Sequence, residues 1–207
     1  MGISFLNRDT IAGIARQSGG LNYLTPDPLF WSGQVFVINN STQKKYNATE
    51  YIQLYNDLGT PITSTIHKNT EDLINNLIHP DIPLFCLYGT GVKTEMQFKY
   101  SHFSNTSEVV QPYEVISNDF GDGTVPLLSL GECKKWQKEL PTNPVKCKEY
   151  HLRSHSEILK DRELVDDLID ILTGKNIDVP DCSQTPEYDK LVNERLSQGL
   201  WVAPERR

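Results

Sequence analysis

An aspartate between two glycines and a histidine further along the chain have the types and order of a catalytic pair. Asp122 lies in the string GDGTVP (121–126), and His155 lies in SHSEIL (154–159). A carboxylate that binds one imidazole nitrogen fixes the ring's tautomer, so the other nitrogen can take a proton from a nucleophile. The flanking glycines allow a tight turn without a Cβ clash. We predict that Asp122 orients His155 as a general base. For GDGT taken alone, a turn closed by an Asx hydrogen bond is the structural alternative.

The order Asp before His, with the histidine just before an amphipathic helix, is the second half of the Ser…Asp…His order of α/β-hydrolases. The serine of that order lies in a G-x-S-x-G elbow, and the sequence contains no such string. The nearest strings, LLSLG at Ser129 and RQSGG at Ser18, both lack the first glycine. We therefore expect the nucleophile to be missing from these 207 residues.

Two metal-site alternatives use the same region. His151, His155 and Glu157 would lie close together if 151–157 were a helix. We expect the two histidines to diverge instead, because the first should end a strand and the second should lie in a loop. Asp119 and Asp122 lack the further oxygen ligands of a calcium loop. The sequence therefore predicts no metal and no cofactor.

The elements that must position this pair follow from hydrophobic spacing and from glycine and proline signals. Strand 84–88 is apolar throughout, so we expect it to be covered on both faces in a parallel sheet. Too few other strands accompany it, so the sheet looks incomplete and the isolated chain should be poorly soluble. The last clear helix should bury the stripe Leu164, Val165, Leu168, Ile169 and Leu172 and end at Gly174. The pattern predicts strands at 34–38, 84–88, 98–103 and 144–152, and helices at 47–59 (N-cap Asn47), 70–78, 161–174 and 187–197.

Composition excludes some functions and suggests a compartment. With 38% hydrophobic and 23% charged residues the chain should fold as a globular protein, and a net charge of −7 argues against a nucleic-acid partner. No apolar run is long enough to span a bilayer, and the first residues do not form a signal peptide. The four cysteines allow several pairings. Glycosylation sequons at Asn39, Asn40, Asn47 and Asn105 mildly favour a secretory compartment.

Five blocks taken in order resemble the lecithin:cholesterol acyltransferase family, with the greatest likeness to its lysosomal phospholipase A/transacylase branch. The resemblance covers roughly residues 5–174, whereas the tail after Gly174 is outside it. The blocks are LNYLTPDPLFWSGQVFV, YNATEYIQLYNDLG, PLFCLYGTGVKTEMQFKY, GDGTVPLLSLGECKKW and SHSEIL.

The resemblance implies an α/β chain that is the C-terminal part of an α/β-hydrolase fold with a piece of its cap domain. Residues 1–80 would be a late cap segment, 81–174 the core that carries the triad residues Asp122 and His155, and 175–207 a tail. It also implies a disulfide between Cys86 and Cys133. Cys147 and Cys182 have no counterpart that the resemblance can place.

The activity that the resemblance implies is that of a serine-dependent lipid O-acyltransferase or phospholipase A, acting on phospholipid acyl esters through an acyl-enzyme. The acceptor would be water, a sterol or another alcohol, and a segment upstream in the family would supply membrane contact. The family implies a lysosomal, vacuolar or extracellular location. We expect this chain to be a fragment that is inactive alone. The alternative is a non-catalytic remnant of the family that binds lipid or a partner.

Overall fold

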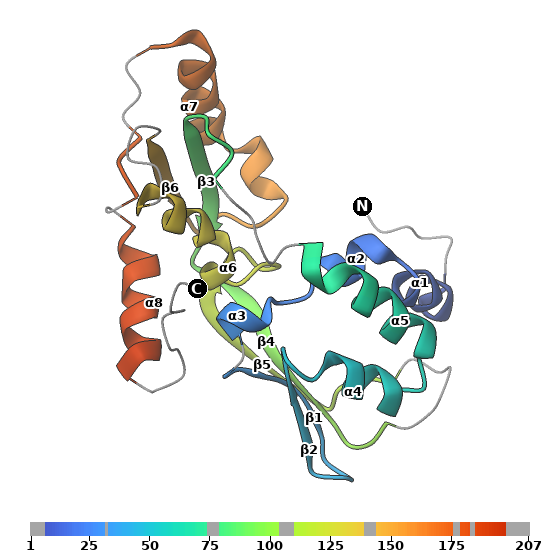
Figure 1. The fold of residues 1–207 in the computed structure, drawn as a ribbon. Coiled ribbons are helices and arrows are strands. Elements are labelled where there is room, and N and C mark those ends of the chain that lie inside the picture. Colours follow the sequence, from blue (N-terminus) through green and yellow to red (C-terminus); the bar gives the residue numbers. More distant parts are fainter. Residues whose placement is uncertain are drawn as a thin grey trace. The chain divides into compact units, whose positions relative to one another are not determined.

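The computed structural model describes residues 7–31, 33–73, 79–103, 110–138, 144–175, 179–182 and 185–197. Helices and strands are mixed along the chain, so the protein is of the α/β class (Figure 1). The chain divides into two compact units, the first within 1–77 and 97–115 and the second within 78–96 and 116–200. The ranges predicted above for cap, core and tail describe functional segments and not compact units. They remain predictions.

The first unit is mainly helical. Helix α1 begins because the Asn7 side chain accepts the amide hydrogen of Thr10 at 2.8 Å, which satisfies one of the free donors of the first turn. Helix α5 has a proline in its first turn, where the missing amide hydrogen costs nothing. The helices of this unit are α1 (Arg8–Arg16), α2 (Gly19–Tyr23), α3 (Pro28–Trp31), α4 (Tyr51–Asp57), α5 (Pro61–Thr70) and the 3-10 turn η1 (Glu71–Leu73).

Two strands of this unit form a hairpin, β1 (Val35–Asn39) and β2 (Lys44–Asn47), which pair antiparallel. The residues 37–39 of β1 also pair in parallel with residues 98–100 of β4 (Val92–Tyr100). With β5 (Glu114–Gly121) these strands give the sheet order β2-β1-β4-β5, and the chain passes between the two units within β4 and β5. Buried aromatic residues fill the interior of the first unit, namely Trp31, Tyr46, Tyr51 and Phe103.

The second unit contains a parallel pair of strands, β3 (Leu84–Thr90) and β6 (Val145–His151), in which Cys86 lies opposite Cys147. Parallel strands need a long crossover, and here it passes through β4, β5, helix α6 (Leu127–Leu130) and the 3-10 segment η2 (Glu132–Lys138). The chain then continues through η3 (Glu157–Lys160), α7 (Arg162–Thr173) and α8 (Pro186–Ser197).

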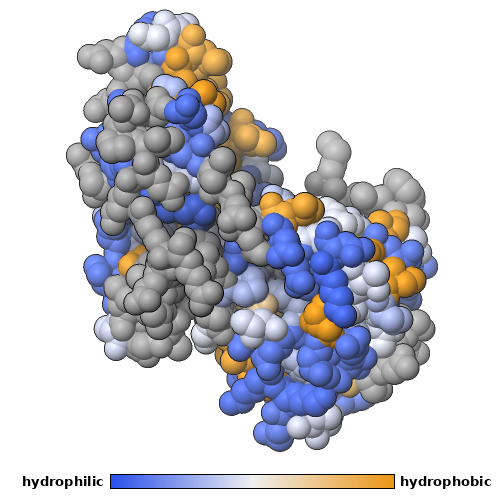
Figure 2. Space-filling view, in the orientation of Figure 1, coloured by the Kyte–Doolittle hydropathy of each residue, from blue (hydrophilic) through white to orange (hydrophobic). Residues whose placement is uncertain are grey.

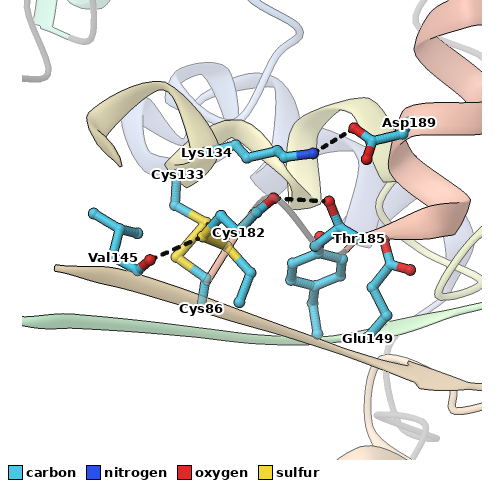
Figure 3. The surroundings of a disulfide bond; sticks show 10 residues. Cys86, Cys133, Lys134, Val145, Glu149, Cys182, Thr185 and Asp189 are labelled. Carbon is cyan, nitrogen blue, oxygen red and sulfur yellow. Dashed lines mark hydrogen bonds and ion pairs between the residues drawn. A yellow bond between two sulfur atoms is a disulfide. The ribbon is translucent and has the colours of Figure 1, made fainter. Parts of the chain in front are cut away.

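Two disulfides lie together beside these strands (Figure 3). Cys86 is bonded to Cys133 of η2, and Cys147 is bonded to Cys182 in the tail. The sulfur atoms of Cys133 and Cys147 are 3.9 Å apart, so the two bridges are neighbours. On the chain-entropy model each bridge is worth roughly 4 kcal/mol.

A half-buried carboxylate also holds the tail. Glu149 of β6 accepts the amide hydrogens of Glu187 and Tyr188, both at 3.1 Å, in the first turn of α8. A negative charge at a helix N-terminus stabilises the helix. Burial raises the pKa of Glu149, and the two amide donors offset part of this rise. Glu149 and Cys147 thus anchor α8 to the same strand.

Helix α7 has the predicted ends but not the predicted packing. The Asp161 side chain accepts the amide hydrogens of Glu163 and Leu164, and Gly174 closes the helix at a φ of 65°. The prediction of a buried stripe is wrong except for Leu164, since Leu172 is 84% exposed. The described part of the chain does not cover this apolar face, which Figure 2 shows on the surface over α7. Val165, Leu168 and Ile169 are exposed as well.

The other predictions have mixed outcomes. Strands at 34–38 and 144–152 and a helix at 187–197 are confirmed within a residue or two as β1, β6 and α8. Strand 84–88 is present as part of β3, but it is not covered on both faces as predicted, since residues 84–87 are only partly buried. Among the described residues, β3 pairs only with β6. The strand predicted at 98–103 begins earlier, at Val92, and ends at Tyr100.

The helix predictions in the first unit need correction. Helix α4 begins at Tyr51 with Glu50 as its N-cap, because the Asn47 side chain instead accepts the amide hydrogen of Thr49 in a tight turn. The helix expected at 70–78 is preceded by α5, which the sequence analysis missed, and residues 74–78 lie outside the described part. Within the described residues, no helix has the length and apolar character needed to cross a membrane.

Candidate active site

The loop after β5 holds Asp122 in a fixed orientation. The Asp122 side chain is buried, and its Oδ1 accepts the amide hydrogens of Thr124 at 2.9 Å and Val125 at 2.8 Å. These bonds form the Asx turn that GDGT alone suggested, and they use only Oδ1 of the carboxylate. Oδ2 remains available for the proposed orienting role.

Both glycines of this loop are needed, for different reasons. A Cβ on Gly121 would lie 2.2 Å from Thr94 Oγ1 and 2.6 Å from the carbonyl oxygen of Val125. Gly123 has a φ of +89°, a region that residues with a Cβ rarely adopt. The loop is therefore packed against β4 as closely as its backbone permits.

Thr94 is a supporting residue that the sequence analysis missed. Its side chain is fully buried, its hydroxyl accepts the amide hydrogen of Gly123 at 3.0 Å, and the same hydroxyl donates to the Val92 carbonyl at 2.9 Å. It thereby ties the aspartate loop to β4. No local signal in the sequence marks a threonine 29 positions earlier as a partner of this loop.

His155 lies in the turn between β6 and η3. The strand ends as Leu152 takes a left-handed conformation, with a φ of 57°. Ser154 then donates its hydroxyl to the Glu157 carboxylate at 2.8 Å, and Arg153 pairs with Asp161. These contacts hold the turn on both sides of the histidine.

The structure brings Asp122 and His155 together. His155 Nδ1 lies 2.8 Å from Asp122 Oδ2, and the His155 amide donates to the Asp122 carbonyl at 2.8 Å. An ionised carboxylate can only accept, so Nδ1 carries the hydrogen of this bond and Nε2 has the lone pair. The Asp122 side chain is 5% exposed and that of His155 is 56% exposed. The carboxylate is thus buried, whereas the imidazole is exposed.

The structure keeps the alternative metal ligands apart. His151 ends β6 with its ring beside Gly91, whereas the ring of His155 is on Asp122. Asp119 is an exposed residue of β5. Among the described residues, the group of possible ligand atoms close enough to hold a metal is Cys86, Cys133 and Cys147, which are all in disulfides.

The predicted pairing of Cys86 with Cys133 is present. The partner of Cys147, which the sequence left open, is Cys182. The sequons differ in accessibility. Asn39 is buried and its amide donates to the Phe103 carbonyl, so this site is a poor glycosylation acceptor in the folded chain. Asn40 is exposed, Asn47 is half-buried and Asn105 lies outside the described residues.

Comparison of the sequence with known proteins identifies the family of this chain. The family model described as lecithin:cholesterol acyltransferase matches residues 38–162, which is more than half of the chain and includes both Asp122 and His155. The chain belongs to the lecithin:cholesterol acyltransferase family. The match ends at the first residue of α7, so the rest of α7, α8 and the residue Cys182 lie beyond it.

Curated members of the lecithin:cholesterol acyltransferase family align with part of the chain. The lysosomal phospholipase A and acyltransferase of Canis lupus familiaris is 31% identical over 122 residues, which is 59% of this chain and 28% of that protein. The enzyme of the same name from Homo sapiens is 30% identical over 122 residues, again 59% and 28%. The phosphatidylcholine-sterol acyltransferase of Homo sapiens is 27% identical over 165 residues, 79% of this chain and 36% of that protein. The chain thus spans between a quarter and two fifths of these relatives.

Proposed function

We propose that this chain contributes the acid and the base of a serine-dependent lipid O-acyltransferase or phospholipase A. The observation that carries the proposal is the bond between Asp122 Oδ2 and His155 Nδ1 at 2.8 Å, inside the segment that matches the family. The names of the relatives, which describe phospholipase A and acyltransferase activities, support the general reaction class.

In this proposal His155 Nε2 takes the hydroxyl proton of a serine as that serine attacks the carbonyl carbon of a phospholipid acyl ester. Asp122 stabilises the imidazolium that forms. His155 then gives the proton to the departing lysophospholipid oxygen, which leaves an acyl-enzyme. Water or an alcohol such as a sterol next loses a proton to His155 and attacks the acyl carbonyl. The bond between the acyl carbon and the serine oxygen then breaks, His155 returns the proton to that oxygen, and fatty acid or a new ester is released. None of these 207 residues supplies the serine in a G-x-S-x-G elbow, so the chain alone should be inactive.

The same proposal assigns the segments and the setting. Residues 81–174 would be the C-terminal part of an α/β-hydrolase core, supported by the parallel pair β3–β6 and the loop that follows β5. Residues 1–80 would belong to the cap and 175–207 to a tail. Two disulfides favour an oxidising compartment, which agrees with a lysosomal, vacuolar or extracellular location. Phospholipid in a membrane surface would be the donor.

The test uses the longest translation product that contains these residues together with a G-x-S-x-G elbow. It is incubated with phosphatidylcholine vesicles that contain a long-chain alcohol, and fatty acid and ester are measured. Asp122→Asn should lower kcat on the order of 10⁴-fold, and His155→Ala at least as much. Asp119→Asn is the matched control, because that carboxylate is exposed and three positions away. Equal turnover by the Asp119 and Asp122 variants would overturn the proposal.

The second candidate function is a non-catalytic family remnant that binds lipid or a partner. It predicts that no translation product of the gene hydrolyses phospholipid, while the 207-residue chain still binds vesicles. Turnover by any product that depends on His155 would exclude it.

A further inference from the structure

The two disulfides of the second unit differ in how deeply they are buried. Cys147 and Cys182 are both 0% exposed, and they lie in one apolar cluster with Val145. Cys86 is half-buried, which makes it the most exposed of the four cysteines. Because access is one of the factors that decide which sulfur a thiol attacks, we expect a small thiol from solvent to react at Cys86. The bridge that ties the tail to β6 is shielded from such direct attack.

The sulfur that an attack on Cys86 would release lies beside the buried bridge (Figure 3). Cys133 Sγ is 3.9 Å from Cys147 Sγ. A disulfide bond is about 2.0 Å long, so the two atoms need to approach by only about 2 Å. The pairing of β3 with β6 sets Cys86 opposite Cys147, so the backbone of the sheet holds the two bridges next to each other. A thiolate at Cys133 would thus be placed to attack the second disulfide.

The surroundings also accommodate the thiol that this second attack would produce. Cys182 Sγ lies 3.4 Å from the carbonyl oxygen of Val145, a contact that Figure 3 draws as a dashed line. A disulfide sulfur has no hydrogen, whereas a thiol donates a weak hydrogen bond. The contact therefore becomes a hydrogen bond only when Cys182 is reduced. A free thiol at Cys182 would have an acceptor already beside it.

We propose that Cys86 is a modification site for a small monothiol of the glutathione class, and that Cys133 passes the exchange on to the buried bridge. The thiolate of the monothiol attacks Cys86 Sγ, a mixed disulfide forms there, and the bond from Cys86 to Cys133 breaks. Cys133 leaves as a thiolate and attacks Cys147 Sγ. The bond from Cys147 to Cys182 then breaks, and Cys182 leaves as a thiolate that takes up the proton lost by the monothiol.

A second monothiol completes the reduction. It attacks the mixed disulfide at Cys86, which releases the oxidised dimer of the monothiol and leaves Cys86 as a thiol. Two monothiols are thus oxidised, and the protein keeps one disulfide, between Cys133 and Cys147, in place of two. The tail loses its covalent bond to β6 and is held there through the hydrogen bonds that Glu149 accepts from α8. None of these steps uses the proposed catalytic pair.

The products are mapped on the wild-type chain. It is incubated with reduced glutathione, its free thiols are blocked with a maleimide, and it is digested with trypsin without reductant. Trypsin separates Cys133 from Cys147, because lysines lie between them. Mass spectrometry should find glutathione on Cys86, a disulfide that joins Cys133 to Cys147, and maleimide on Cys182 but not on Cys147. Direct reduction would instead label Cys147 and Cys182 together. Any set of products without the Cys133–Cys147 disulfide would overturn the proposal.

A matched pair of variants tests the role of Cys133. Cys86→Ser and Cys133→Ser lose the same bridge, so a general loosening of the fold would affect the bond between Cys147 and Cys182 equally in both. Cys86→Ser leaves a free Cys133, so the Cys133–Cys147 disulfide and a thiol at Cys182 should appear without added glutathione. Cys133→Ser should keep Cys147 bonded to Cys182. Because Cys86 Sγ also lies within 4.8 Å of Cys147 Sγ, the comparison decides which sulfur attacks. Equal loss of the Cys147–Cys182 bond in the two variants would refute the role of Cys133.

Discussion

Replacing Gly121 with alanine tests whether the packing of the aspartate loop against β4 controls the geometry of the Asp122–His155 contact. The new Cβ would lie 2.2 Å from Thr94 Oγ1 and 2.6 Å from the Val125 carbonyl, whereas ordinary contact begins at 3.4 Å. The backbone must therefore move by about 1 Å (3.4 − 2.2 = 1.2 Å). Thr94 is fully buried and Val125 contributes a backbone atom, so neither can easily yield. Overpacking of this kind costs about 1–3 kcal/mol.

Urea unfolding of the 207-residue chain measures this cost, and hydrogen exchange at the His155 amide reports locally, because that amide donates to the Asp122 carbonyl. Gly13→Ala is the control. Nothing lies within 4 Å of a Cβ at Gly13, which is inside helix α1, so alanine there should stabilise by up to about 1 kcal/mol. In a catalytically complete protein, a 1 Å displacement of Asp122 should lower turnover on the order of 10²-fold.

A second substitution tests the stated cause. Thr94→Ala removes the oxygen at 2.2 Å but leaves the Val125 carbonyl at 2.6 Å, so the pair Gly121→Ala with Thr94→Ala should be less destabilised than the sum of the single variants. If Gly121→Ala unfolds at the same urea concentration as the wild type, the loop is not tightly packed and the reasoning fails.

Four further outcomes are expected. Thr94→Val leaves the Gly123 amide without its acceptor, so urea unfolding should show a loss of about 1–3 kcal/mol; an unchanged midpoint would contradict the bridging role. Because burial lowers the pKa of His67, the unfolded chain takes up a proton below about pH 6.5 that the folded chain resists. The urea midpoint of the first unit should fall from pH 7.5 to 5.5, and a persistent slope in His67→Phe would refute this cause. Replacing both Cys147 and Cys182 with alanine should lower the free energy of unfolding by roughly 4 kcal/mol and speed amide hydrogen exchange in α8. Unchanged exchange would mean that Glu149 is enough to hold α8 on β6 without the disulfide. Sedimentation should show self-association of the isolated chain that Leu172→Lys reduces, and a monomeric wild type would disprove it.

The part of the site that could be predicted from the sequence rests on local signals. The glycines around Asp122 specify a turn, and the position of His155 before a capped helix specifies a loop. The local backbone conformation of each residue could therefore be predicted from its neighbours in the sequence. The chain order of an aspartate before a histidine predicted the pairing of Asp122 with His155, and the family resemblance agreed with it. The pairing of Cys86 with Cys133 came from the family resemblance alone. The ends of α7 could also be predicted, because Asp161 caps the first turn with its side chain and Gly174 ends the last turn in a left-handed conformation.

The rest depends on contacts between distant segments, which one sequence does not encode in a readable pattern. Thr94 supports the aspartate loop from another strand, and the pairing of Cys147 depends on where the tail returns. The spacing of Leu168 and Leu172 correctly indicates an amphipathic helix, but it does not indicate what covers the apolar face. Helix α5 was missed because its threonines and serine have no apolar period, although Pro61 marked its start.

The bond between Cys147 and Cys182 closes a covalent ring with a sequence separation of 35, and His155 lies within that ring. A protease that cuts one peptide bond in this ring therefore cannot separate the two resulting pieces, which stay joined through sulfur. A nicked molecule would migrate as an intact chain on a gel without reductant and would keep its histidine beside the aspartate loop. Where proteases are abundant, the ring would thus keep Asp122 and His155 in one covalently joined molecule after a cut between Cys147 and Cys182.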